Sequence, residues 1–173
     1  MLLPIRTLGD PVLREPAKPV ERFDRALRRL ADDMLETMYE APGVGLACPQ
    51  VGVSLRMFTY DDGEVGPSVM VNPELVDPSG EIVEEEGCLS IPGPFHPTTR
   101  FRTITCRGLD VKGRLVEVTG DGLLARIFQH ETDHLDGTLY IDRLDDDGRR
   151  AVLAELRRIE LGLTEPSRRL DRP

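Results

Sequence analysis

Cysteines and long apolar runs are scarce in this sequence of 173 residues. The three cysteines, Cys48, Cys88 and Cys106, form an odd and sparse set, which does not fit a disulfide framework and is typical of a reducing compartment. No apolar segment has the length needed to cross a bilayer, and a proline and an arginine interrupt the first six residues, unlike a signal peptide. We therefore expect a cytoplasmic protein with no membrane partner.

Positive charge is also limited, with 22 Lys and Arg against 31 Asp and Glu and a net charge of −9. Binding to DNA phosphates requires a basic face, so we expect no DNA partner. Residues 143–173 are an exception, because eight arginines there balance seven acidic residues. Length and composition indicate one domain over residues 1–173, in which a C-terminal helix and tail begin at about residue 146.

Apolar residues at helical spacing predict three helices. Asp24 is a suitable N-cap for the first, which must end before Pro42 and Gly43. The second helix spans residues 122–135 and has a broad apolar face. The third spans about 147–161, with most of its arginines on the side opposite its apolar residues.

The middle of the chain is typical of β-structure. Short apolar runs between turn residues predict strands at 55–60, 69–71, 80–86 and 103–106, and Lys112-Gly113 indicates a hairpin joining 109–111 to 115–119. The first 20 residues and the segment 93–100 contain several prolines, so we expect an irregular strap and a loop there. These elements predict an α+β fold, in which small mixed or antiparallel sheets pack around the helix at 122–135, with an N-terminal and a C-terminal helix beside them.

That central helix carries the pattern H-E-x-x-H at residues 130–134. His130 and His134 are one helical turn apart on the same face, so both imidazoles can reach one metal ion. Glu131 lies one position further round, where it can accept a proton from a water at the metal without occupying the coordination shell. The pattern predicts a mononuclear metal-hydrolase site.

A third protein ligand is needed, and the residue types leave several candidates. They are His96 in the proline-rich segment, Glu155 and Glu160 downstream, and Cys88, which follows a glycine that permits close backbone approach. A thiolate suits a divalent transition metal, which favours Cys88, although a lone cysteine is more often a small buried side chain.

Three segments together resemble the peptide deformylase family. They are GVGLACPQ at 43–50, EGCLS at 86–90 and QHETDHLDG at 129–137, in the order and at the separation typical of that family. The segment GDPVLR at 9–14 is similar to the beginning of bacterial members. A single motif of this kind is weak evidence of a relationship. Three motifs in register are strong evidence, and the likeness covers nearly the whole domain.

The resemblance implies that Cys88, His130 and His134 hold the metal and that Glu131 acts as general base and then acid. It also implies that the side-chain amide of Gln50 and the backbone N–H of Leu89 stabilise the developing oxyanion, which is chemically reasonable for neutral donors. The expected ion is a single divalent metal, with Fe²⁺ as the natural ion and Zn²⁺ or Ni²⁺ possible in the isolated protein.

The resemblance further implies an extended substrate segment. The backbone at Val44 and Gly45 would pair with the substrate peptide like an added strand, and Gly87 would offer the same on the opposite wall. A dinucleotide loop is excluded here, because Cys48 stands where the third glycine of G-x-G-x-x-G is required. Apolar residues of the central helix, Leu123 and Ile127, are expected to line a methionine pocket.

The implied activity is removal of the formyl group from the N-terminal methionine of new polypeptides, with release of formate. The alternatives are an H-E-x-x-H endopeptidase and a silent relative whose metal is structural, which would need a fourth ligand. Cys48 replaces a residue that is usually alanine in the family, and it is either a space-filling thiol or a second thiol near the metal. Ribosome contact through a C-terminal helix is also implied, with arginines at 149, 150, 157, 158, 168, 169 and 172.

Overall fold

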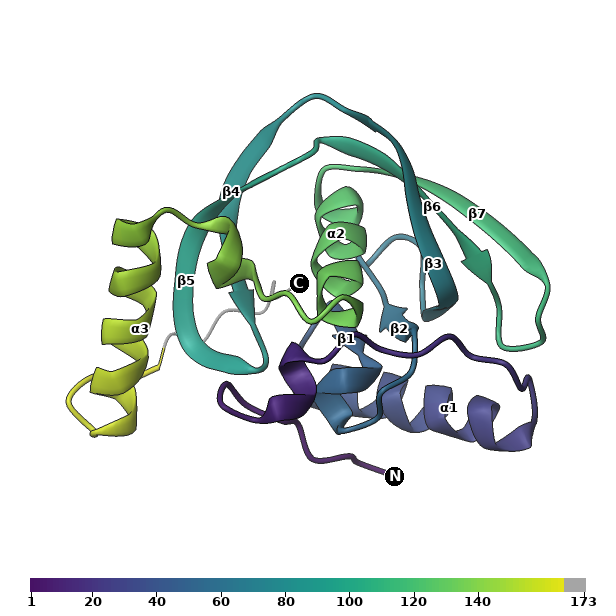
Figure 1. Cartoon of the computed structure of the whole chain (residues 1–173), viewed down its shortest axis with the longest axis horizontal. Helices are drawn as coiled ribbons and strands as arrows, with labels where there is room; N and C mark the ends of the chain where they lie inside the picture. Colours follow the sequence, from purple (N-terminus) through teal and green to yellow (C-terminus); the bar gives the residue numbers. More distant parts are fainter. Residues whose placement is uncertain (167–173) are drawn as a thin grey trace.

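A five-stranded antiparallel sheet and a two-stranded hairpin enclose a central helix in the computed structural model, which describes residues 1–166 (Figure 1). The larger sheet has the order β1-β2-β3-β6-β7 and consists of β1 (Gly45–Ala47), β2 (Met57–Tyr60), β3 (Ser68–Ser79), β6 (Thr103–Leu109) and β7 (Leu115–Asp121). The smaller sheet pairs β4 (Ile82–Cys88) with β5 (Ile91–Arg100). The predicted α+β class is confirmed, and every strand pairing in both sheets is antiparallel.

The helices agree closely with prediction. They are α1 (Arg25–Glu40), α2 (Leu123–Leu135) and α3 (Asp146–Glu160), with short 3-10 turns η1 (Pro11–Arg14), η2 (Cys48–Val51) and η3 (Tyr140–Arg143). The carboxylate of Asp24 accepts a hydrogen bond from the backbone N–H of Leu27 at 3.0 Å, which confirms it as the N-cap of α1. In Figure 1, α2 stands between the two sheets, and α3 lies along the outer side of β5.

Strands β3 and β5 differ from the sequence-based prediction, because their prolines are typical of loops. The expected proline-rich loop at 93–100 is most of strand β5. Among the described residues β5 pairs only with β4, and an edge strand tolerates residues that lack a backbone N–H. Strand β3 is far longer than the predicted 69–71, because its Pro73 and Pro78 lie at register shifts, where the ladder with β6 is interrupted. The hairpin around Lys112-Gly113 is present, and its strands β6 and β7 pair Leu109 with Leu115.

Helix α2 is buried on all sides. From Leu124 to Leu135 every residue is buried, polar ones included. Its apolar side joins an aromatic cluster in which the ring of Phe128 lies 5.2 Å from that of Tyr60 and 6.3 Å from that of Phe58. The polar side faces β4, β5 and η2, which must therefore supply partners for its charged groups. Within residues 1–166, no helix is long and apolar enough to cross a membrane.

Candidate metal centre

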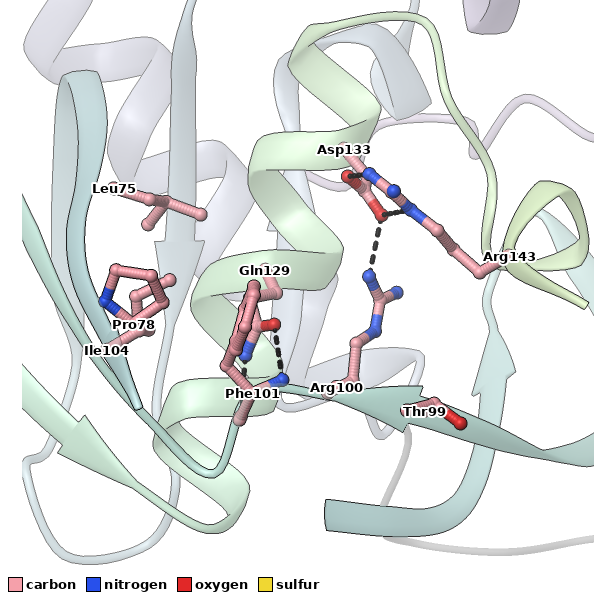
Figure 2. Close-up of a pocket in the computed structure, with 9 residues that line it drawn as sticks. All are labelled: Leu75, Pro78, Thr99, Arg100, Phe101, Ile104, Gln129, Asp133 and Arg143. Atoms are coloured by element: carbon pink, nitrogen blue, oxygen red, sulfur yellow. Dashed lines mark hydrogen bonds and ion pairs between the residues drawn. The ribbon is translucent and has the colours of Figure 1, made fainter. Parts of the chain in front are cut away.

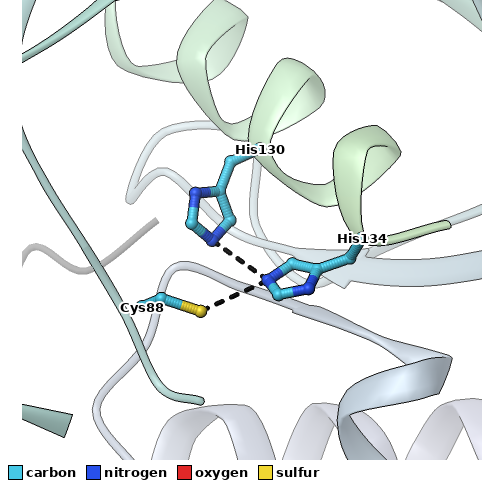
Figure 3. A group of neighbouring side chains, drawn as sticks. All are labelled: Cys88, His130 and His134. Atoms are coloured by element: carbon cyan, nitrogen blue, oxygen red, sulfur yellow. Dashed lines mark hydrogen bonds between the residues drawn. The ribbon is translucent and has the colours of Figure 1, made fainter. Parts of the chain in front are cut away.

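Three buried donor side chains converge beside α2 (Figure 3). His130 and His134 come from successive turns of the helix, and Cys88 is the last residue of β4. The Nε2 atoms of the two histidines lie 3.3 Å apart, and the Cys88 Sγ lies 3.3 Å from the His134 Nε2. One ligand atom from each residue lies within 4.8 Å of the others, so a single ion can contact all three.

The donor set fits a divalent transition metal. Two imidazole nitrogens and a thiol are the ligand types that such ions prefer, and three protein ligands leave a further position for water or substrate. The other candidates for the third ligand do not belong to this group: His96 lies on β5, where its ring contacts the carbonyl of Pro97 at 3.0 Å, and Glu155 and Glu160 lie on α3.

Glu131 lies beside the donors with its carboxylate fully buried. Both of its oxygens lack a hydrogen-bond partner among the described residues, and burial raises the pKa of this carboxyl to about 7. A Cβ atom placed on Gly45 would lie 2.8 Å from the Glu131 Cδ, so only a glycine leaves room for this side chain. A buried carboxyl without a partner is costly, and such groups occur mainly where they have a chemical task.

The amide of Gln50 is oriented by the backbone. The N–H of Ala47 can only donate, and it donates to the Gln50 Oε1 at 2.9 Å, which turns the amide NH₂ toward the donor group. Its Nε2 lies 3.2 Å from the Ser90 Oγ and 3.7 Å from the Cys88 Sγ. Leu89 and Ser90 form the two-residue turn between the paired residues Cys88 and Ile91, so Leu89 directly follows the thiol.

The residues predicted to bind substrate lie at different depths. Strand β1, which holds Gly45 and directly follows Val44, is an outer strand of its sheet and pairs only with β2. Gly87 is buried at a register shift of β4, and a Cβ atom there would lie 2.8 Å from the Phe95 Cδ1. Leu123 is partly buried, whereas Ile127 is completely buried in the core cluster.

Sequence reasoning missed two residues behind the donors. Glu86 accepts a hydrogen bond from the Nδ1 of His130 at 2.6 Å, and Arg100 holds the same carboxylate. Burial alone would raise the pKa of Glu86, but the hydrogen bonds from His130 and Arg100 lower it to about 2. The position of Glu86 directly before Gly87-Cys88 was a usable signal for its role. Nothing near Arg100 in the sequence indicates the contact of Arg100 with Glu86.

Cys48 is separate from the donor group. Its Sγ lies 3.5 Å from the Met34 Sδ in a core cluster that also contains Leu46 of β1, and burial raises the pKa of the thiol to about 12. It is not among the residues that could jointly hold an ion. The space-filling interpretation therefore accounts for Cys48, and the structure does not support it as a fourth ligand.

A buried cysteine from β4 converges with the two histidines of an H-E-x-x-H helix, and the glutamate of that helix has no partner among the described residues. This arrangement is that of a metal-dependent hydrolase of the one-ion class. The model of the polypeptide deformylase family matches residues 2–150. A peptide deformylase of Acidothermus cellulolyticus is 52% identical over 163 residues, covering 91% of this chain and 87% of the relative. One from Parafrankia sp. is 53% identical over 159 residues, covering 90% of this chain and 86% of the relative.

Solved structures agree with this relationship. The crystal structure of a peptide deformylase from Legionella pneumophila has a TM-score of 0.89 and 44% identity, covering 96% of this chain and 100% of that one. The enzyme from Thermus thermophilus has a TM-score of 0.85 and 44% identity, covering 94% and 100%. The chain belongs to the peptide deformylase family of metal-dependent hydrolases, whose members remove the formyl group from the N-terminal methionine of new polypeptides.

Cys88 belongs to the donor group and Cys48 to the core, so we expect mutations of these two buried cysteines to have different effects. Cys48→Ala should lower the free energy of unfolding by about 1 kcal/mol, as for loss of one buried heavy atom, and leave metal content and deformylation of formyl-Met-Ala-Ser unchanged. Cys88→Ala, the matched change in a donor, should abolish stoichiometric metal binding. Urea unfolding and elemental analysis of both variants check this, and metal loss in Cys48→Ala would contradict the assignment of its thiol to the core.

Proposed function

We propose that this chain hydrolyses the formamide bond of N-formylmethionyl peptides, with Cys88, His130 and His134 holding one divalent ion and Glu131 moving the protons. The observation that carries the proposal is the fully buried Glu131 carboxyl, which has no partner among the described residues and belongs to the residue directly after His130, one of the three converging donors. When bound, the ion supplies Lewis acidity that lowers the pKa of water and polarises the formyl oxygen.

Glu131 has two tasks in this proposal. Its carboxylate accepts a proton from the attacking water, and the carboxylic acid so formed later donates a proton to the leaving amine. Gly45 has no side chain that would fill the space beside the Glu131 carboxyl, and the two oxygens of that carboxyl have no partner among the described residues. The carboxyl is therefore available for both transfers. No other acidic side chain of α2 is placed this way, since Asp133 is held by arginines.

Gln50 and Leu89 are proposed to stabilise the oxyanion that develops on the formyl oxygen. The Ala47 N–H fixes the Gln50 amide with its NH₂ toward the Cys88 sulfur, so this donor is oriented before substrate arrives. The N–H of Leu89 follows the thiol in the tight turn. Donors oriented in advance toward a developing charge lower the barrier by a few kcal/mol each, typically about 3.

The substrate backbone is proposed to extend the larger sheet. Strand β1 has a partner on one side only, and the segment at Val44 and Gly45 can accept an added strand there, with Gly87 on the opposite wall. Leu123 and Ile127 are proposed for the methionine pocket. Of these two, the partly buried Leu123 has the more suitable exposure, whereas Ile127 belongs to the closed core.

Glu131→Gln tests the proton-transfer role. The amide is nearly isosteric but cannot accept a proton, so kcat for formyl-Met-Ala-Ser should fall by about 10²- to 10⁴-fold while metal content is retained. Glu155→Gln on α3 is the matched control and should leave kcat unchanged. Formate release from formyl-Met-Ala-Ser and cleavage of unformylated casein are measured side by side. Unchanged turnover by Glu131→Gln would refute its role, and casein cleavage without formate release would favour an endopeptidase.

Fe²⁺ is the ion that we propose for the native protein, because the family resemblance favours it, whereas the Cys/His/His set is compatible with Zn²⁺ and Ni²⁺ as well. Protein purified without oxygen should contain about one iron per chain, lose activity in air, and regain it after replacement by Ni²⁺ or Co²⁺. Metal analysis and formate assays before and after exposure to air check this. Full activity in air with stoichiometric zinc would contradict iron as the natural ion.

Contact with the ribosome through α3 is a further part of the proposal, in keeping with a cytoplasmic enzyme that acts on nascent chains. Arg157 and Arg158 are exposed near the end of the helix, and the Arg158 Nε donates to the Thr164 Oγ1 at 3.4 Å. Arg150 is paired with Asp147, and the Arg149 Nε donates to the carbonyl of Ile141. The predicted contributions of Arg168, Arg169 and Arg172 lie outside the described residues. Val152 and Leu156 of α3 are buried in a cluster that includes Cys88, so removing the helix would also disturb the site.

Charge reversal therefore tests ribosome contact better than truncation. Arg157→Glu with Arg158→Glu should weaken co-sedimentation with ribosomes in low salt, because nucleic-acid contacts depend on phosphate neutralisation. The matched control is Arg28→Glu with Arg29→Glu, an exposed arginine pair on α1. Equal co-sedimentation of the two double variants with ribosomes would contradict a contact through α3.

A further inference from the structure

A continuous row of charged side chains lies behind His130. The His130 Nδ1 donates to the Glu86 Oε1 at 2.6 Å, and Arg100 grips both oxygens of that carboxylate, with Nη2 at 2.5 Å and Nε at 3.1 Å. The remaining nitrogen of Arg100, Nη1, donates to the Asp133 Oδ2 at 2.7 Å. Four groups from α2, β4 and β5 are thus joined without an intervening gap.

The row continues to the surface through Arg143 of η3. Its Nη2 and Nε donate to the two oxygens of Asp133 at 2.7 and 3.2 Å, so this carboxylate lies between two guanidinium groups (Figure 2). Side-chain exposure rises from 0% at Glu86 and 4% at Arg100 to 10% at Asp133 and 51% at Arg143. The ion pairs closest to His130 are therefore shielded from water and from screening by salt.

A neutral imidazole carries one N–H. Because the Glu86 carboxylate accepts a hydrogen bond at Nδ1, that nitrogen is the one that carries the proton, and Nε2 presents a lone pair toward Cys88 and His134. The second histidine differs, since the Nδ1 of His134 is buried with no partner among the described residues. Of the two histidines, only His130 has its Nδ1 bound by a charged side chain within residues 1–166.

We propose that Arg100 is a positioning residue of the metal centre, which holds the Glu86 carboxylate in the orientation that aims the Nε2 of His130 at the ion. The inference rests on the proposed role of His130 as a metal ligand. An arginine is required because its planar fork contacts both oxygens of Glu86 and still reaches Asp133, which a single ammonium cannot do. Asp133, held from outside by Arg143, fixes the far end of the fork.

The first measurement is the affinity of the metal-free protein for Zn²⁺, obtained by competition with a chelator. Arg100→Gln should weaken binding by about 10- to 100-fold, the usual effect of losing a partner behind a ligand, and Arg100→Lys should weaken it less. Arg56→Gln is the matched control. Arg56 also binds the end of α2, at the Asp136 carboxylate and the carbonyl of Leu135, but it has no contact with Glu86, so affinity should be unchanged.

The second measurement separates positioning from general damage. In the Zn²⁺-loaded protein the hydrogen-bonded Nδ1–H of His130 should give a downfield proton resonance that is absent in Arg100→Gln and retained in Arg56→Gln. With Co²⁺ loaded, kcat should fall in Arg100→Gln while KM for formyl-Met-Ala-Ser is unchanged. Equal Zn²⁺ affinity and an unchanged resonance in the two glutamine variants would overturn the inference.

His130→Ala distinguishes this inference from the proposed function. If His130→Ala binds Zn²⁺ like the unaltered protein, the proposed metal site itself fails. If His130→Ala loses Zn²⁺ but Arg100→Gln does not, only the positioning role fails. Should Arg100→Gln not fold, Arg100→Lys and Arg56→Lys decide, because lysine keeps the charge and removes the fork: weaker binding in the first alone supports the inference, and equal binding overturns it.

Discussion

Helix α2 carries six consecutive residues without an apolar side chain, Gln129 to His134, and all six are buried. In a protein interior each of those groups needs a partner or a ligand. The amide of Gln129 binds the backbone of Phe101, Asp133 binds two arginines, and His130 binds Glu86. Glu131 is left with no partner among the described residues, and it lies next to the donors.

The two sheets have different tasks around this helix. The five-stranded sheet brings Gly45 against Glu131 and, through η2, positions Gln50 next to the Cys88 thiol. The β4–β5 hairpin supplies Cys88 itself and the acid–arginine pair behind His130. Because no single element contains the site, its geometry depends on how both sheets pack against α2, and metal binding is expected to be coupled to folding.

Much of the fold could be predicted because its signals are local. The Asp24 cap, the helix end before Pro42 and the hairpin near Gly113 all depend on neighbouring residues. Strand β5 and most of β3 could not be predicted, because their prolines resemble loop residues. Those prolines are tolerated only because β5 has one partner strand and β3 shifts register beside Pro73 and Pro78, which are properties of the assembled sheets.

For the site, the sequence by itself determined the pair His130 and His134 with Glu131 between them, since helical spacing alone places them on adjoining turns. On residue types alone Cys88 was one of several candidates for the third ligand, and the resemblance to the family singled it out. Whether Cys48 is a second thiol near the metal was decided only by the tertiary structure, which places the Cys88 sulfur 3.3 Å from the His134 Nε2 and the Cys48 sulfur against Met34. The contact of Arg100 with Glu86 was likewise decided by packing, because it joins side chains whose proximity depends on sheet pairing and not on any local period in the sequence.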